Sequence, residues 1–153
     1  MLDCPESAQK GPMLRLAWGE WIANLRPWEW FVTLTFKPPK QGIYDRRGIA
    51  YTKRAVQRFT DEVSYHAPTP CLVDGVWAIE RHVSEAPHVH GLMTATTSWR
   101  SLGRRMDMVD WAWEHTGMAR VEAVEELGAP FYVSKYIMQG GPECLILNVQ
   151  KPG

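Results

Sequence analysis

Three absences limit what kind of protein this sequence encodes. The three cysteines, Cys4, Cys71 and Cys144, are too few and too scattered for a disulfide framework or a zinc site, and they suit a reducing cytoplasm. No apolar run approaches the length that crosses a membrane. No glycine-rich Walker motif is present either. We therefore expect a cytoplasmic protein with no membrane contact and no ATP-dependent motor of its own.

An excess of charge is also missing. Lys and Arg total 17, as do Asp and Glu, so the formal net charge is zero. Nucleic-acid-binding domains are usually basic, because neutralisation of phosphate dominates their affinity. Any nucleic-acid contact here would need a local basic patch or a bound cation. With 45% hydrophobic residues, the chain can form one core, and we expect a flexible tail over residues 1–12 and one domain over 13–153.

The hydrophobic pattern predicts helices and strands along the whole chain. Helical spacing of apolar residues predicts helices over 13–25, 51–65, 98–115 and from residue 131 to the glycines at 140–141. Alternation and short apolar runs predict strands over 31–36, 73–83, 87–93, 119–124 and 144–149. This order predicts an α+β fold of the ferredoxin-like or RRM-like kind, an antiparallel five-stranded sheet with helices packed over one face.

Two histidines on one strand form the first candidate site. His88 and His90 flank one apolar residue, so both imidazoles point to the same face. Glu80 lies on the preceding strand, and we expect it near the level of His90 on that face. These three side chains are a candidate site for Mg²⁺ or Mn²⁺, with His82 as a rival ligand. The alternative is that the histidines lie on a solvated strand or bond to the backbone.

The second candidate group lies in the segment 131–137. On a helix, Tyr132 and Tyr136 are four residues apart and place their hydroxyls on one face, with Lys135 within reach of both. Beside a metal site, the two tyrosines are candidate nucleophiles. The alternative is an amphipathic helix with half-buried tyrosines.

A third group combines arginine with tryptophan. Single-stranded DNA is commonly bound by aromatic faces that stack on bases and by guanidinium groups that hold phosphates. The candidate DNA contacts are Trp99, Arg100, Arg104 and Arg105.

Taken in order, these motifs resemble those of the HUH endonucleases, in particular the rolling-circle replication initiators (Rep) of small phages, plasmids and single-stranded DNA viruses. The alternating strand at 31–36 is similar to the first family motif. Glu80 with His88 and His90 is similar to the second, which supplies metal ligands. Tyr132, followed by Lys135 and Tyr136, resembles the third, whose tyrosine attacks DNA.

The resemblance implies nicking and joining of single-stranded DNA at a replication origin, through a covalent 5′-phosphotyrosine intermediate and with a separate helicase as partner. Tyr132 is the first choice of nucleophile, Tyr136 matches the second tyrosine of two-tyrosine initiators, and Lys135 would stabilise the phenolate. Three alternatives stay open. They are a single-tyrosine transposase of the same superfamily, a noncatalytic nucleic-acid-binding module on the same fold, and a metal-dependent hydrolase that activates water.

Overall fold

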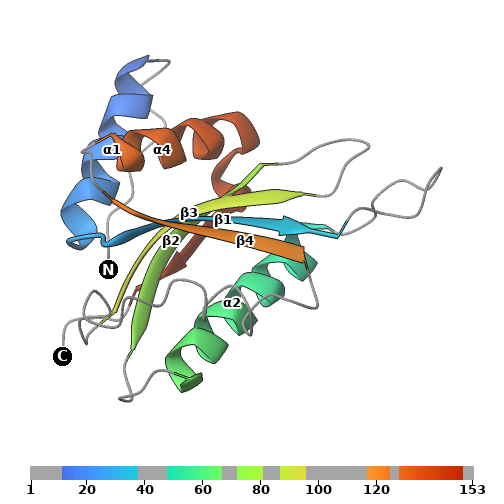
Figure 1. The fold of residues 1–153 in the computed structure, drawn as a ribbon. Coiled ribbons are helices and arrows are strands. Elements are labelled where there is room, and N and C mark those ends of the chain that lie inside the picture. Colours follow the sequence, from blue (N-terminus) through green and yellow to red (C-terminus); the bar gives the residue numbers. More distant parts are fainter. Residues whose placement is uncertain are drawn as a thin grey trace.

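An antiparallel five-stranded sheet forms the centre of the computed structural model (Figure 1). The structure describes residues 12–37, 48–66, 72–80, 87–95, 117–124 and 128–149. Along the chain the elements are α1 (Pro12–Leu25), β1 (Trp30–Phe36), α2 (Ile49–His66), β2 (Val73–Glu80), β3 (His88–Ala95), β4 (Gly117–Ala123), α4 (Ala129–Gly140), the 3₁₀ helix η2 (Pro142–Cys144) and β5 (Leu145–Asn148).

The strands lie in the order β4-β1-β3-β2-β5, and each neighbouring pair is antiparallel. The predicted α+β class and five-stranded antiparallel sheet are therefore confirmed. The run β1-α2-β2-β3 follows the first half of a β-α-β-β-α-β unit. The helix predicted over 98–115 lies outside the described residues.

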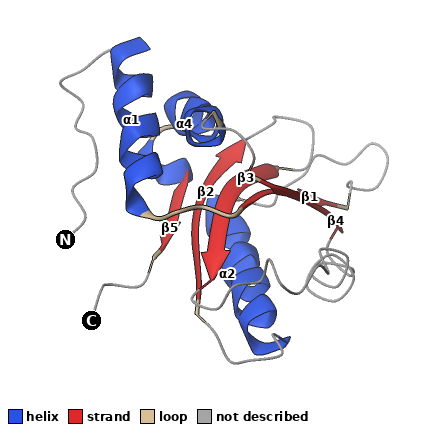
Figure 2. Ribbon diagram, turned by 60° about the vertical axis from the view of Figure 1, so that its left-hand side comes forward, coloured by secondary structure: helices blue, strands red, loops and turns tan. Residues whose placement is uncertain are grey.

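The prediction that helices cover one face of the sheet is wrong, because they cover both. Figures 1 and 2 show α1 and α4 on one side of the sheet and α2 on the other. The burial of the strands gives the reason. In β2 and β3 nearly every residue is buried, and a strand that is apolar on both sides needs cover on both.

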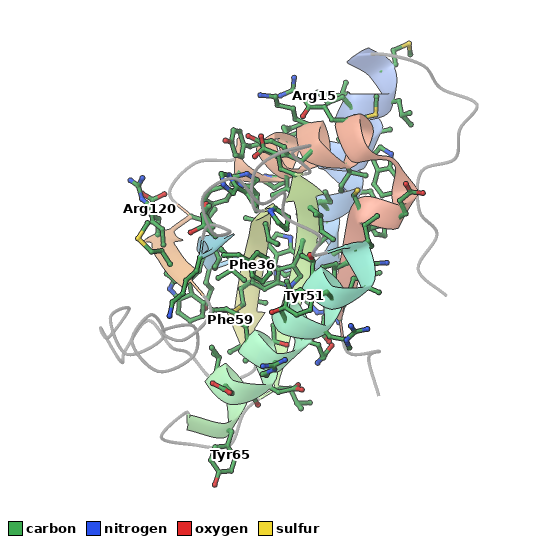
Figure 3. The ribbon with its side chains drawn as sticks, turned by 90° about the vertical axis from the view of Figure 1, so that its right-hand side faces the viewer. Arg15, Phe36, Tyr51, Phe59, Tyr65 and Arg120 are labelled. Carbon is green, nitrogen blue, oxygen red and sulfur yellow. The ribbon has the colours of Figure 1, made fainter. Side chains whose placement is uncertain are left out.

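The face toward α2 carries the larger core. Alternate residues of β1, from Trp30 to Phe36, point to this side and are buried. Phe59 of α2 meets the fully buried Trp77 edge to face, with ring centroids 6.0 Å apart. In Figure 3, Phe36, Tyr51 and Phe59 lie in the region between α2 and the sheet. This layer fixes the sheet from behind, on the face opposite the histidines.

The other face is covered by α1 and α4, which pack against each other. Gly19 of α1 allows the close approach, since a Cβ there would overlap the ring of Phe131 on α4. Ile22 of α1 and Val133 and Ile137 of α4 are buried against the sheet. Among the described helices, none is both long and apolar enough to span a membrane.

Candidate active site

The register of β3 with its two neighbours brings the predicted site residues to one face of the sheet, the face that α4 covers. His90 pairs with Thr33 of β1 and with Ala78 of β2. His88 pairs with Thr35 and with Glu80. Residues paired across antiparallel strands point to the same face, so the carboxylate and both imidazoles share it.

The expected level of Glu80 is corrected by this register. Glu80 lies opposite His88, not opposite His90. Its side chain nevertheless reaches His90 along the diagonal of the sheet, a separation that long side chains can bridge. Glu80 Oε2 is 2.8 Å from His90 Nε2 and 3.9 Å from His88 Nδ1. The carboxylate therefore contacts both imidazoles.

His90 is the most enclosed member of this group. Its side chain is 9% exposed, against 36% for His88 and 26% for Glu80. Burial lowers the pKa of His90 below its ordinary value of 6.5, although the hydrogen bond and charge of Glu80 act in the opposite direction. The neutral ring donates its Nε2 proton to the carboxylate. Its Nδ1 is buried and has no hydrogen-bond partner among the described residues.

The donor chemistry of these residues fits a hard divalent cation. Imidazole and carboxylate together bind Mn²⁺ and related ions. The 2.8 Å between Glu80 Oε2 and His90 Nε2 is close to the roughly 3 Å that separates adjacent ligands of an octahedral ion with bonds of about 2.1 Å. Within the described ranges, however, no three or more His, Cys, Asp or Glu side chains are already placed to hold a metal ion. A cation would have to replace the proton between His90 and Glu80 and draw His88 closer.

Helix α4 carries the tyrosines. It begins with a proline in its first turn, where a missing N–H costs nothing, and ends before Gly141, which adopts a φ of 84°. As expected from the four-residue spacing, the hydroxyls of Tyr132 and Tyr136 share one face of the helix, and they are hydrogen-bonded at 2.8 Å. Lys135 Nζ is 6.0 Å from the ring centroid of Tyr132 and 5.3 Å from that of Tyr136. All three therefore lie together.

The tyrosines of α4 lie directly on the histidine strand. The Tyr136 ring stacks on the His90 imidazole, with centroids 4.2 Å apart and an interplanar angle of 17°. The Tyr132 ring meets His90 edge to face at 5.7 Å. Burial is the main cause that raises the pKa of Tyr136, followed by its hydrogen bond to Tyr132. Two motifs more than forty residues apart in the sequence thus form one cluster.

Phe31 is a site residue that the sequence did not single out. Its ring lies nearly parallel to that of His90, with centroids 6.5 Å apart, and meets Tyr132 edge to face at 5.5 Å. Its position two residues before Thr33 placed it on the threonine face. The register of β1 against β3, which brings this face to His90, could not be read from the sequence.

Beyond α4 the same face of the sheet continues onto β4. Thr33 pairs with Arg120 and Thr35 with Met118, so these four side chains share the face of His88 and His90. Met118 is largely exposed, and Arg120 forms an exposed ion pair with Glu122. Figure 3 shows Arg120 at the edge of the molecule. A polar, accessible surface therefore adjoins the histidine and tyrosine cluster.

Several predicted residues lie outside the described part of the chain. They are the rival ligand His82 and the candidate DNA contacts Trp99, Arg100, Arg104 and Arg105. Their roles stay predictions.

Comparison with known proteins gives one match. The family model of replication-associated protein ORF2 matches residues 29–141. No curated protein and no solved structure matches the chain significantly. The matched range includes the threonine strand, the histidine strand and the tyrosine helix. Because it spans well over half of the 153 residues, the chain belongs to the family of replication-associated protein ORF2.

Proposed function

We propose that this protein nicks and rejoins single-stranded DNA at a specific replication origin and so starts rolling-circle replication. The intermediate would be a covalent bond from Tyr132 to the 5′ phosphate of the cut strand. The observation that carries the proposal is the contact between Tyr132 and His90, whose ring centroids are 5.7 Å apart. In a replication-associated family, a tyrosine beside an imidazole and carboxylate cluster suits phosphoryl transfer through a protein nucleophile.

Tyr132 is the better placed of the two candidate nucleophiles. It is 40% exposed, whereas Tyr136 is 7% exposed. Tyr132 Oη would form a bond to the scissile phosphorus while the bond from phosphorus to the 3′ oxygen breaks. The phenolic proton would pass to solvent, and the departing oxygen would take up a proton to become a 3′-hydroxyl. No ATP is needed, because the phosphotyrosine retains the energy of the broken bond and the reverse attack rejoins the strand.

Glu80, His88 and His90 would hold Mg²⁺ or Mn²⁺. The ion would supply positive charge for the phosphate oxygens in the transition state. Lys135 would add a second positive charge beside the Tyr132 ring, which favours the phenolate that forms as the proton leaves. A local concentration of positive charge of this kind offers an answer to the zero net charge of the chain.

The accessible surface on β1 and β4 suggests the path of the DNA. Thr33, Thr35 and Arg120 share the face of the histidines, and hydroxyl and guanidinium groups are common partners of phosphate oxygens. A single strand lying across this surface would reach Tyr132 at the edge of α4. A helicase supplied by a partner would unwind the duplex, since the chain contains no Walker motif.

The proposal is tested by incubating the purified protein and Mn²⁺ with single-stranded oligonucleotides tiled across the DNA that adjoins its gene. A denaturing gel would reveal a covalent adduct that EDTA prevents. Tyr132→Phe should abolish the adduct, because it removes only the attacking oxygen. Tyr65→Phe is the matched control, since Tyr65 is an 83% exposed tyrosine on α2, across the sheet from the site.

Two results would contradict the proposal. An undiminished adduct in Tyr132→Phe would show that another residue is the nucleophile. DNA binding that is indifferent to EDTA and leaves no covalent product on any oligonucleotide would favour the noncatalytic binding module. That module is the second candidate, because no preformed group of three metal ligands occurs in the described residues.

A further inference from the structure

Tyr136 makes contacts that differ in kind from those of Tyr132. Its ring lies flat on the His90 imidazole, with centroids 4.2 Å apart. Its hydroxyl is 2.8 Å from the hydroxyl of Tyr132. One side chain therefore touches both a candidate metal ligand and the candidate nucleophile.

The surroundings of Tyr136 do not suit a second nucleophile. It is 7% exposed and belongs to the core between α4 and the sheet, whereas Tyr132 is 40% exposed. The neighbouring residues Val133 and Ile137 are also buried in this core. Because they fix the rotation of α4, Tyr136 cannot take the place of Tyr132 without disrupting the packing of the helix.

We infer that Tyr136 is a positioning residue and not an alternating second nucleophile: its hydroxyl orients the Tyr132 hydroxyl, and its ring holds the His90 imidazole in place. This inference rests on the proposed function and assigns different tasks to the two tyrosines. The hydroxyl fixes the attacking oxygen by a hydrogen bond. The ring limits rotation of an imidazole that has to keep its Nε2 directed at the Glu80 carboxylate.

The two tasks can be separated by substitution. Tyr136→Phe removes the hydroxyl and keeps the stacked ring, while Tyr136→Leu removes the ring as well. Each variant would be given the tiled single-stranded oligonucleotides and Mn²⁺, with adducts mapped by mass spectrometry of the linked peptide. Calorimetry of the DNA-free protein would measure the Mn²⁺ dissociation constant independently of activity. Tyr65→Phe again serves as the control for loss of a hydroxyl elsewhere.

The expected adduct is confined to Tyr132 in the unmodified protein and in Tyr136→Phe, and is absent in Tyr132→Phe. Tyr136→Phe should slow adduct formation by about two- to tenfold, the effect of one neutral hydrogen bond, and leave the Mn²⁺ dissociation constant unchanged. Tyr136→Leu should raise that constant by about tenfold or more, as is typical when the support of a metal-binding histidine is lost. A purely structural role would not separate the two variants in this way.

An adduct on Tyr136 in any of these proteins would overturn this inference and leave the proposed function standing. An unchanged adduct rate in Tyr136→Phe would overturn the role of the hydroxyl, and an unchanged Mn²⁺ dissociation constant in Tyr136→Leu would overturn that of the ring. A complete lack of adduct in the unmodified protein would refute the proposed function, and this inference with it.

Discussion

Gly91→Ala is expected to destabilise the protein markedly, because the space beside Gly91 is already filled. Gly91 lies between His90 and Leu92 on β3 and pairs with Trp77 of β2. An added Cβ would overlap the six-membered ring of the Trp77 indole and come within 2.6 Å of its Cδ2. Trp77 is fully buried and has Phe59 against it, so the indole has little freedom to move away.

The expected magnitude follows from the cost of overpacking a core. Extra carbon atoms in a well-packed interior cost about 1–3 kcal/mol, and the melting temperature of a domain of this size falls by about 2–4 °C per kcal/mol. Gly91→Ala should therefore lower the melting temperature by roughly 2–12 °C. Urea denaturation followed by circular dichroism would give the change in unfolding free energy.

A matched control comes from Gly128, where an added Cβ would meet nothing within 4 Å and the backbone is in the right-handed helical region. Gly128→Ala should be neutral or slightly stabilising. Combining Gly91→Ala with Trp77→Phe should cost less than the sum of the two single changes, because the smaller ring leaves room for the methyl group. Equal stability of Gly91→Ala and Gly128→Ala, or strict additivity with Trp77→Phe, would refute the reasoning.

Three further outcomes are expected. Arg26→Ala should lower the free energy of unfolding in urea by about 1–3 kcal/mol, since Arg26 Nε lies 2.9 Å from Oδ2 of the buried Asp74; a change below about 0.5 kcal/mol, typical of surface sites, would contradict this. Because the pKa of His90 lies below 6.5 in the folded state, the unfolded state takes up the proton first as the pH falls. The contribution of His90 to stability should be complete above pH 6.5 and should decrease as the pH falls toward the lowered pKa; denaturation at several pH values should show a shallower decrease in His90→Gln, and equal slopes would contradict the assignment. EDTA should abolish the covalent adduct and leave the circular dichroism spectrum unchanged, whereas unfolding in EDTA would give the metal a structural role.

Local periodicity in the sequence predicted most of the secondary structure. The alternation at 31–36 gave β1, with its threonines opposite the buried residues, and the four-residue spacing of Tyr132 and Tyr136 placed their hydroxyls together. These features depend only on neighbours along one strand or one helix. They were predictable because such neighbours are fixed by backbone geometry alone.

Features that depend on pairing between distant segments were harder to predict. The hairpin register put Glu80 opposite His88 and not His90, because the hydrophobic pattern alone does not fix where the hairpin turns. The cover on both faces depends on how the apolar residues of β2 and β3 are shared between α2 and the α1–α4 pair. The contacts of Phe31 with His90 and Tyr132 require the pairing of β1 with β3 and the docking of α4.

The most direct test of the proposed chemistry is the fate of the new 5′ end after cleavage. The unmodified protein, Mn²⁺ and an oligonucleotide labelled on the 3′ side of the cut would be digested with a protease, and the labelled peptide sequenced by mass spectrometry. We predict that the label stays on the peptide containing Tyr132, through a phosphotyrosine bond. A free 5′ phosphate, with no peptide attached at any time during the reaction, would mean that water is the nucleophile and would contradict the role of Tyr132.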